Sequence, residues 1–116
     1  SEEAFKFGFG RLLKDMSDKT SVMVMGLTAV KESCMPFAEC LWYSNQACSN
    51  YELLIEESCL EMDIPFLPIY KAMTEVPSWE EWIHSDGIHL NQIGHEWIYK
   101  RVINWHSMKN WSNNIG

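Results

Sequence analysis

The sequence lacks a long apolar run and the beginnings of a secretory leader. Its longest nearly unbroken apolar segment, residues 22–30, is far shorter than the roughly 20 residues that a membrane-spanning helix needs. The first residues, Ser-Glu-Glu, have neither the basic nor the apolar character of a signal peptide. These absences predict a soluble, cytoplasmic protein without a transmembrane segment.

Positive charge is also scarce. Nine Lys and Arg residues stand against 16 Asp and Glu residues, so the formal net charge is −7. A surface of this sign repels phosphate backbones and anionic membranes. We therefore do not expect nucleic acid as a partner.

No two of the four cysteines form a C-x-x-C pair, which argues against a zinc ribbon or a dithiol redox site. The 116 residues, 47% of them hydrophobic, provide enough apolar mass for one domain without disulfides. We expect reduced, mostly buried thiols, with a Cys34–Cys40 disulfide as the alternative.

The apolar pattern predicts a strand–helix–strand unit after an N-terminal amphipathic helix over residues 2–16. Residues 22–27 are apolar at consecutive positions, which is typical of a parallel strand covered on both faces. Ser49-x-x-Glu52 is a capping box that predicts a helix of about 13 residues, with a start one turn earlier as the alternative. Residues 64–69 form the second predicted strand, which gives a βαβ unit.

The remaining segments connect to this unit. Residues 28–45 have no clean period and predict a long loop. Ser78-x-x-Glu81 is a second capping box ahead of a short helix, and residues 92–105 form the last predicted helix. We assign residues 1–106 to the domain and residues 107–116 to a polar tail.

Two parallel strands make too small a sheet to stand alone. Their fully apolar character requires neighbouring strands, and their edges otherwise lie unpaired. The pattern therefore predicts part of a larger α/β sheet, in which further strands precede Ser1 in an intact protein or come from a second chain.

Asp86 and His89 are the strongest candidate catalytic residues. They lie three apart across a glycine, just before the last predicted helix. A carboxylate that accepts a hydrogen bond from one imidazole nitrogen leaves the other nitrogen free to take a proton. On spacing alone, a plain turn followed by a surface histidine is the favoured interpretation, because Asp, Gly and His are all common in loops. A zinc site made by His84, Asp86, His89 and His95 is a further alternative, although no H-E-x-x-H pattern supports it.

The segment from Asp86 to His95, D-G-I-H-L-N-x-x-G-H, resembles the last motif of the GDSL-type, or SGNH-hydrolase, esterases and lipases, D-G-x-H-P-N-x-x-G-H. Leu90 departs from the usual proline, a residue that shapes the loop and carries no chemistry. Residues 24–30 and 64–70 are similar to the last two strands of that family. The resemblance spans roughly residues 1–105.

The resemblance implies an α/β fold that is part of a three-layer α/β/α flavodoxin-like arrangement, with only the C-terminal strands and helices present. It places the catalytic aspartate on Asp86 and the catalytic histidine on His89. The family's nucleophilic serine and its oxyanion donors lie in motifs that this chain does not contain, and no G-x-S-x-G motif replaces them.

The implied function is hydrolysis of a small-molecule or lipid ester by the intact protein, without metal or cofactor. Alone, the chain is expected to be close to inactive. The alternative is a non-catalytic interaction module that pairs through its sheet edge, as a homo-oligomer or with a partner chain. Trp42, Tyr43 and Asn45 are candidate residues of the acyl or alcohol pocket, with a core role as the alternative for the aromatics.

Overall fold

A computed structural model describes the backbone of residues 1–115 and the side chains of residues 1–113. The helices are α1 (Glu2–Ser17), α2 (Asn45–Glu61), α3 (Tyr70–Thr74), α4 (Gln92–Ile103) and α5 (His106–Ile115). The strands are β1 (Val24–Met25) and β2 (Phe66–Leu67), and the 3-10 helices are η1 (Glu32–Cys34) and η2 (Trp79–Trp82). Gly116, the last residue of the predicted tail, lies outside the described residues.

The two strands run parallel, as predicted from the strand–helix–strand order. Val24 lies opposite Phe66 and Met25 opposite Leu67, and the Val24 N–H donates to the Pro65 carbonyl at 2.9 Å. Both strands are shorter than the predicted spans 22–27 and 64–69. The result is a mixed α/β structure that consists mostly of helices.

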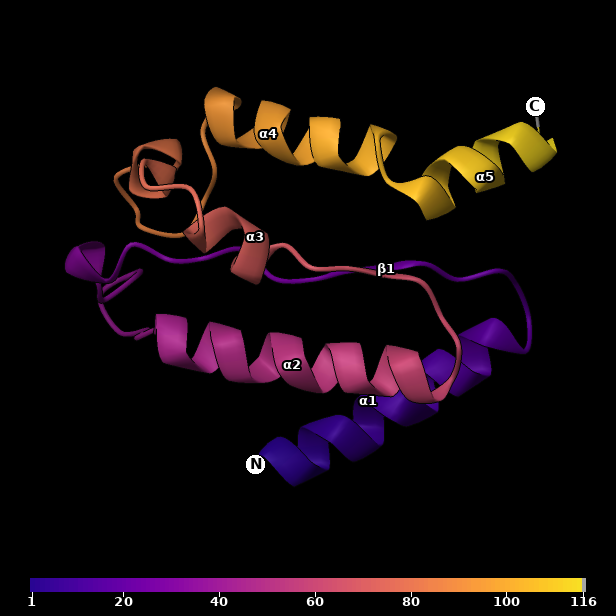
Figure 1. The fold of residues 1–116 in the computed structure, drawn as a ribbon. Coiled ribbons are helices and arrows are strands. Elements are labelled where there is room, and N and C mark those ends of the chain that lie inside the picture. Colours follow the sequence, from indigo (N-terminus) through magenta and orange to yellow (C-terminus); the bar gives the residue numbers. More distant parts are fainter. Residues whose placement is uncertain (116) are drawn as a thin grey trace.

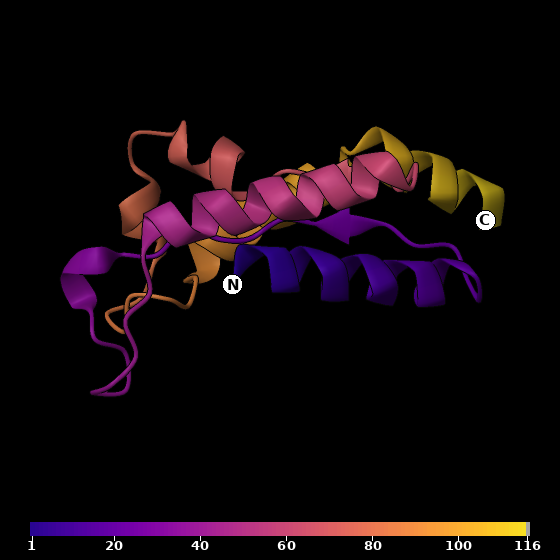
Figure 2. The same cartoon turned by 90° about the horizontal axis from the view of Figure 1, so that it is seen from below.

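The helices cover both faces of the strand pair (Figure 1). α4 and α5 lie on one side of the strands, and α1 and α2 lie on the other. Seen from below, α1 and α2 run side by side (Figure 2). Among residues 1–115, every helix is too short or too polar to cross a membrane.

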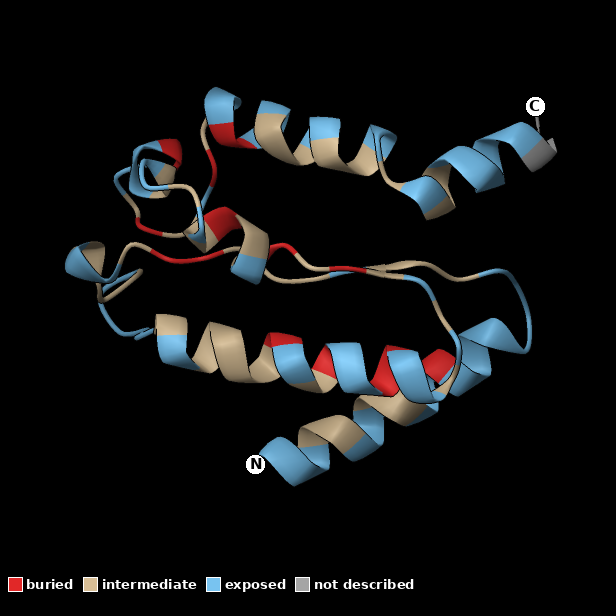
Figure 3. Ribbon diagram, in the orientation of Figure 1, coloured by how far each residue is buried: buried red, intermediate tan, exposed pale blue. Residues whose placement is uncertain are grey.

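Two small apolar clusters form the core. One joins α1, α2 and the strands around Leu13, Ile55 and Cys59. The other lies between α3, η2 and α4 and contains Ala29, Met73, Trp82, Ile83 and Leu90. Figure 3 shows the buried positions along the strands and on the side of α2 that faces them.

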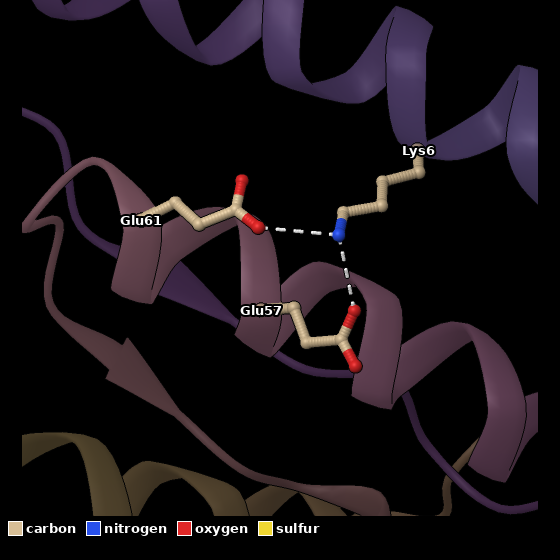
Figure 4. Close-up of polar contacts among 3 residues, drawn as sticks. All are labelled: Lys6, Glu57 and Glu61. Atoms are coloured by element: carbon tan, nitrogen blue, oxygen red, sulfur yellow. Dashed lines mark hydrogen bonds and ion pairs between the residues drawn. The ribbon is translucent and has the colours of Figure 1, made fainter.

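An exposed ion-pair cluster links the outer surfaces of α1 and α2 (Figure 4). The Lys6 ammonium lies 3.2 Å from Glu57 and 3.2 Å from Glu61. Hydrogen bonds to Glu61 and then Glu57 raise the pKa of Lys6. Because all three side chains are well exposed, solvent screens the attraction, and the apolar contact between the helices outweighs it.

Neither predicted capping box makes its side-chain capping bonds, although the second does precede a short helix as predicted. α2 begins at Asn45, and its cap is Ser44, whose hydroxyl accepts from the Ala47 N–H at 3.1 Å. The alternative start one turn earlier is therefore correct. Ser78 does precede η2, but its side chain makes no capping bond to the helix. The Ser49-x-x-Glu52 spacing does not mark the start of α2, because tertiary hydrogen bonds hold Glu52 elsewhere.

Two further expectations differ from the structure. The apolar run predicts that residues 22–27 are covered on both faces, yet Met25 is 48% exposed, and among the described residues β1 has a strand neighbour on one edge only. Helix α4 ends at Ile103 rather than residue 105, and α5 follows where the sequence indicated a polar tail. The division into a domain and a tail stays a prediction.

The Glu52 carboxylate, 5% exposed, joins α2 to the carboxyl ends of both strands. Its Oε1 accepts N–H groups from Leu27, Ile69 and Tyr70 at 3.0, 3.0 and 2.8 Å. Its Oε2 accepts the Lys71 N–H at 3.0 Å. Gly26 lets the backbone approach this closely, since an added Cβ would lie 2.0 Å from Oε1.

This arrangement makes Glu52 the most sensitive polar position of the fold. In Glu52→Gln, an NH₂ group replaces one acceptor oxygen and faces a backbone N–H, so at least one buried donor loses its partner. We expect a loss of at least about 2 kcal/mol in the free energy of unfolding, measured by urea denaturation.

The matched control is Glu56→Gln, one turn along the same helix, whose side chain is exposed. It should change stability by no more than about 0.5 kcal/mol. Equal stability of the two variants would contradict the role assigned to Glu52.

Candidate active site

The candidate catalytic residues lie on a tight hairpin between η2 and α4. Ile83 and Leu90 form an antiparallel bridge, and the His84 N–H donates to the His89 carbonyl at 2.8 Å. Within the turn, the Gly87 N–H donates to the His84 carbonyl at 2.9 Å. These bonds bring Asp86 and His89 to the same end of the hairpin.

Asp86 and His89 are in direct contact. Asp86 Oδ2 lies 2.5 Å from Nδ1 of His89, while Oδ1 accepts the backbone N–H groups of Ile88 and His89, both at 3.0 Å. The carboxylate therefore fixes the turn and the imidazole together. With Nδ1–H donating to Asp86, Nε2 is left as the acceptor nitrogen on a side chain that is 67% exposed.

The electrostatics of the pair keep Asp86 ionised. The backbone N–H groups of His89 and Ile88, followed by the His89 side chain, lower the pKa of Asp86 to about 2. An ionised carboxylate can accept a hydrogen bond from the imidazole N–H. It also stabilises the positive charge of the imidazolium that forms when the ring takes a proton.

The hairpin rests on the loop that follows β1. The Lys31 N–H donates to the Gly87 carbonyl at 2.8 Å. Gly87 has a φ of +86°, and an added Cβ would lie 2.8 Å from Cβ of Cys34. Only glycine satisfies both the backbone angle and the close packing at this position.

An aromatic contact extends this support to the imidazole itself. The ring of Phe37 meets the His89 ring edge-on, with centroids 6.2 Å apart, and lies 6.3 Å from the ring of Tyr43. Sequence reasoning missed Lys31 and Phe37, because both lie in a segment without a period. No local pattern could have placed them beside a hairpin more than 50 residues away.

Asn91 joins the hairpin to the helix that follows. Its side chain caps α4 by accepting the Gly94 N–H at 3.1 Å, and its amide donates to the Glu81 carbonyl at 2.7 Å. The Asn91 N–H also donates to the Trp82 carbonyl at 2.7 Å. The start of α4 predicted from the sequence is therefore confirmed. Asn91 ties this start to η2, which precedes the hairpin.

The three candidate pocket residues separate into two groups. Trp42 and Tyr43, 74% and 44% exposed, line an apolar hollow of about 670 Å³ together with Phe5, Phe9 and the inner face of α2. Asn45 instead holds the backbone: its Oδ1 accepts the Val30 N–H and its Nδ2 donates to the Val30 carbonyl, both at 2.8 Å. The role of these residues toward a substrate stays a prediction.

The cysteines and the zinc alternative can be placed as well. All four cysteines are free thiols, and Cys59 is buried, whereas Cys40 is exposed. Burial, followed by the nearby carboxylates, raises the pKa of Cys48 and so disfavours its thiolate.

The zinc alternative is not supported by the geometry. Among the described side chains, no group of three His, Cys, Asp or Glu residues is close enough to hold a metal ion, and this holds for His84, Asp86, His89 and His95 as well.

No protein-family model matches the chain, and no solved structure matches it significantly. Among curated proteins, the chain is similar to the GDSL esterase/lipase WDL1 of Oryza sativa subsp. japonica, with 24% identity over 96 residues. The match covers 78% of this chain and 37% of that protein, so the chain spans little more than a third of the relative's length. The similarity indicates a distant relationship to a region of a GDSL esterase/lipase.

The geometry of the pair makes a prediction about pH. Because the pKa of Asp86 is lowered, its contribution to the folded state is present above the ordinary value of 3.8 and is lost as the pH falls through about 2. A ¹³C NMR titration of the Asp86 carboxyl should therefore have its midpoint near 2.

In His89→Ala the midpoint should rise but stay below 3.8, since both backbone N–H donors remain. A wild-type midpoint at 3.8 would show that the hairpin does not hold the carboxylate as described.

Proposed function

We propose that this chain carries the acid–base half of a GDSL-type, or SGNH-class, serine esterase. The observation that supports this most directly is the Asp86–His89 pair, with Nδ1 bound to the carboxylate and Nε2 on an exposed ring. The distant similarity to a GDSL esterase/lipase agrees with it. The enzyme activity belongs to an intact protein that also supplies a nucleophile.

In the proposed mechanism, Nε2 of His89 takes the proton of a serine hydroxyl as the serine oxygen attacks an ester carbonyl. His89 then returns this proton to the leaving alcohol, and a water molecule repeats the sequence to release the acid. Asp86 keeps the ring in the tautomer that accepts at Nε2 and stabilises the imidazolium that forms. In this proposal the serine comes from polypeptide outside these 116 residues, since no serine of the chain lies in a G-D-S or G-x-S-x-G motif.

We place the chain in a three-layer α/β/α, flavodoxin-like fold of which it forms the C-terminal portion. Residues 1–106 form that portion, and residues 107–116 are an appended segment. The accessible surface, 7745 Å², exceeds the roughly 6600 Å² typical of a compact monomer of 13.6 kDa. The radius of gyration, 15.5 Å, likewise exceeds the roughly 13 Å typical of this length. Both excesses support a structure that continues beyond the chain.

The substrate is a small-molecule or lipid ester. The apolar hollow beside Trp42 and Tyr43 suits an acyl or alcohol chain, and the Tyr43 and Phe37 rings form a continuous aromatic path from its rim to His89. The apolar lining favours a hydrocarbon group over a sugar at this position.

The proposal is tested with a longer polypeptide that includes upstream residues with a G-D-S motif. It should hydrolyse a short-chain p-nitrophenyl ester, and His89→Ala should lower kcat/KM by at least about 10³, because the base is removed. The 116-residue chain alone should show no activity above background.

His95→Ala is the matched control, because His95 is an exposed histidine in the first turn of α4 and lies outside the pair. It should retain kcat/KM within about twofold. Full activity in the His89 variant would refute the assignment of the base.

A second candidate function is a non-catalytic module that pairs through its sheet edge. The backbone alternation of β1 directs the Met25 N–H and carbonyl away from β2, and its side chain is 48% exposed, so this edge can accept another strand. Light scattering after size-exclusion chromatography separates the two functions. A stable dimer of the chain with no esterase activity in the extended polypeptide favours the module.

A further inference from the structure

A second hollow lies at the far end of α4 from His89. Its volume is about 420 Å³, and it is lined by residues from β2, the last turn of α4 and the start of α5. The 12 residues of α4 span about 18 Å, so this hollow is well separated from the Asp86–His89 hairpin at the other end of the helix. We call it the α4–α5 hollow.

The α4–α5 hollow is lined by basic and aromatic residues. Lys100, Arg101 and His106 contribute its nitrogen groups, Trp97 and Trp105 contribute aromatic surface, and no Asp or Glu is among the described residues that line it. This composition contrasts with a chain whose formal net charge is −7. A cavity lined by cations without counter-charges is complementary to an anion.

The Arg101 guanidinium is held in place but is not fully paired. It lies over the Trp97 ring, 5.2 Å from the centroid, and its Nη2 makes a long bond of 3.4 Å to the Pro68 carbonyl. Its Nε is buried and has no acceptor, the one such side-chain atom among the described residues. Stacking on Trp97 restricts the guanidinium, and a guanidinium is the side-chain group best suited to bind phosphate or carboxylate oxygens through its terminal N–H groups.

The start of α5 adds donors at the same place. The first helical bond of α5 runs from the Lys109 N–H to the Trp105 carbonyl, so the N–H groups of residues 106–108 precede the hydrogen-bond ladder of the helix. The positive end of a helix dipole favours an anion there.

The helix dipole alone explains only part of the composition of the α4–α5 hollow. Lys100 and Arg101 lie in the last turn of α4, where positive charge is favourable without any ligand. That effect accounts for the charge of the two residues, but not for the aromatic walls beside them. An anion with an attached organic group accounts for both.

We propose that the α4–α5 hollow binds a phosphate ester of a small organic molecule, with Arg101, Lys100 and the start of α5 at the phosphate and Trp97 and Trp105 against the organic part. The volume exceeds what a bare phosphate needs and lies in the range of small-molecule sites. The proposal does not depend on the esterase function, because it involves neither Asp86 nor His89.

The test is a titration of the protein with phenyl phosphate at fixed ionic strength, followed by the indole N–H signals of Trp97 and Trp105 in ¹⁵N NMR spectra. We expect saturable shifts of these two signals and weaker binding of inorganic phosphate, which lacks the ring. Lys100→Gln and Arg101→Gln should each weaken the binding of phenyl phosphate by about tenfold.

The matched control is Lys109→Gln, which removes the same charge from an exposed lysine that lines a different part of the surface. It should change the affinity by no more than about twofold. Lys100 is exposed, so its variant keeps the test valid even where Arg101→Gln, which also loses the stacking on Trp97, lowers stability.

Three results would overturn the proposal. The first is the absence of saturable shifts with phenyl phosphate, and the second is an equal loss of affinity in Lys100→Gln and Lys109→Gln, which indicates general charge attraction only. The third is binding to phosphatidylcholine vesicles containing phosphatidic acid without binding to phenyl phosphate, which assigns the phosphate to a lipid surface instead of a soluble ester.

Discussion

The buried Glu52 carboxylate is the interaction on which the rest of this structure depends. The strands that it joins are two residues long, so their ladder supplies few hydrogen bonds of its own. Four backbone N–H groups on one carboxylate fix the points where β1 and β2 end and hold both against α2. The cost of burying a charge is offset because every donor around it is a fixed backbone dipole.

A series of contacts connects Glu52 to the candidate site. Glu52 holds the backbone of Ile69, Tyr70 and Lys71, which is the start of α3. α3 places Met73, which is fully buried, in the same cluster as Trp82, Ile83 and Leu90. Ile83 and Leu90 form the bridge that closes the Asp86–His89 hairpin. A carboxylate in the sheet layer therefore supports the hairpin without touching it.

How far the sequence predicts this depends on whether the signal is local. The hairpin and the start of α4 could be predicted, because Asp86, Gly87, His89 and Asn91 make their main bonds within a few residues. Glu52 was misassigned as a capping residue, since its four partners come from segments up to 25 residues away. The strand lengths and the exposure of Met25 were wrong for the same reason: apolar runs show which residues avoid water, but not which neighbours cover them.

The two core clusters differ in a way that bears on function. The cluster beneath the hairpin is enclosed by α3, η2 and α4, and all of its central members are buried. The cluster between α1, α2 and the strands borders the apolar hollow beside Trp42, which Phe5 and Phe9 also line. The less enclosed side of the described structure is therefore the side with this hollow, whereas the Asp86–His89 hairpin is held by α3, η2, α4 and the loop after β1. In the proposed esterase, this chain already orders the base and its carboxylate, so the rest of the protein has only to supply a nucleophile at Nε2.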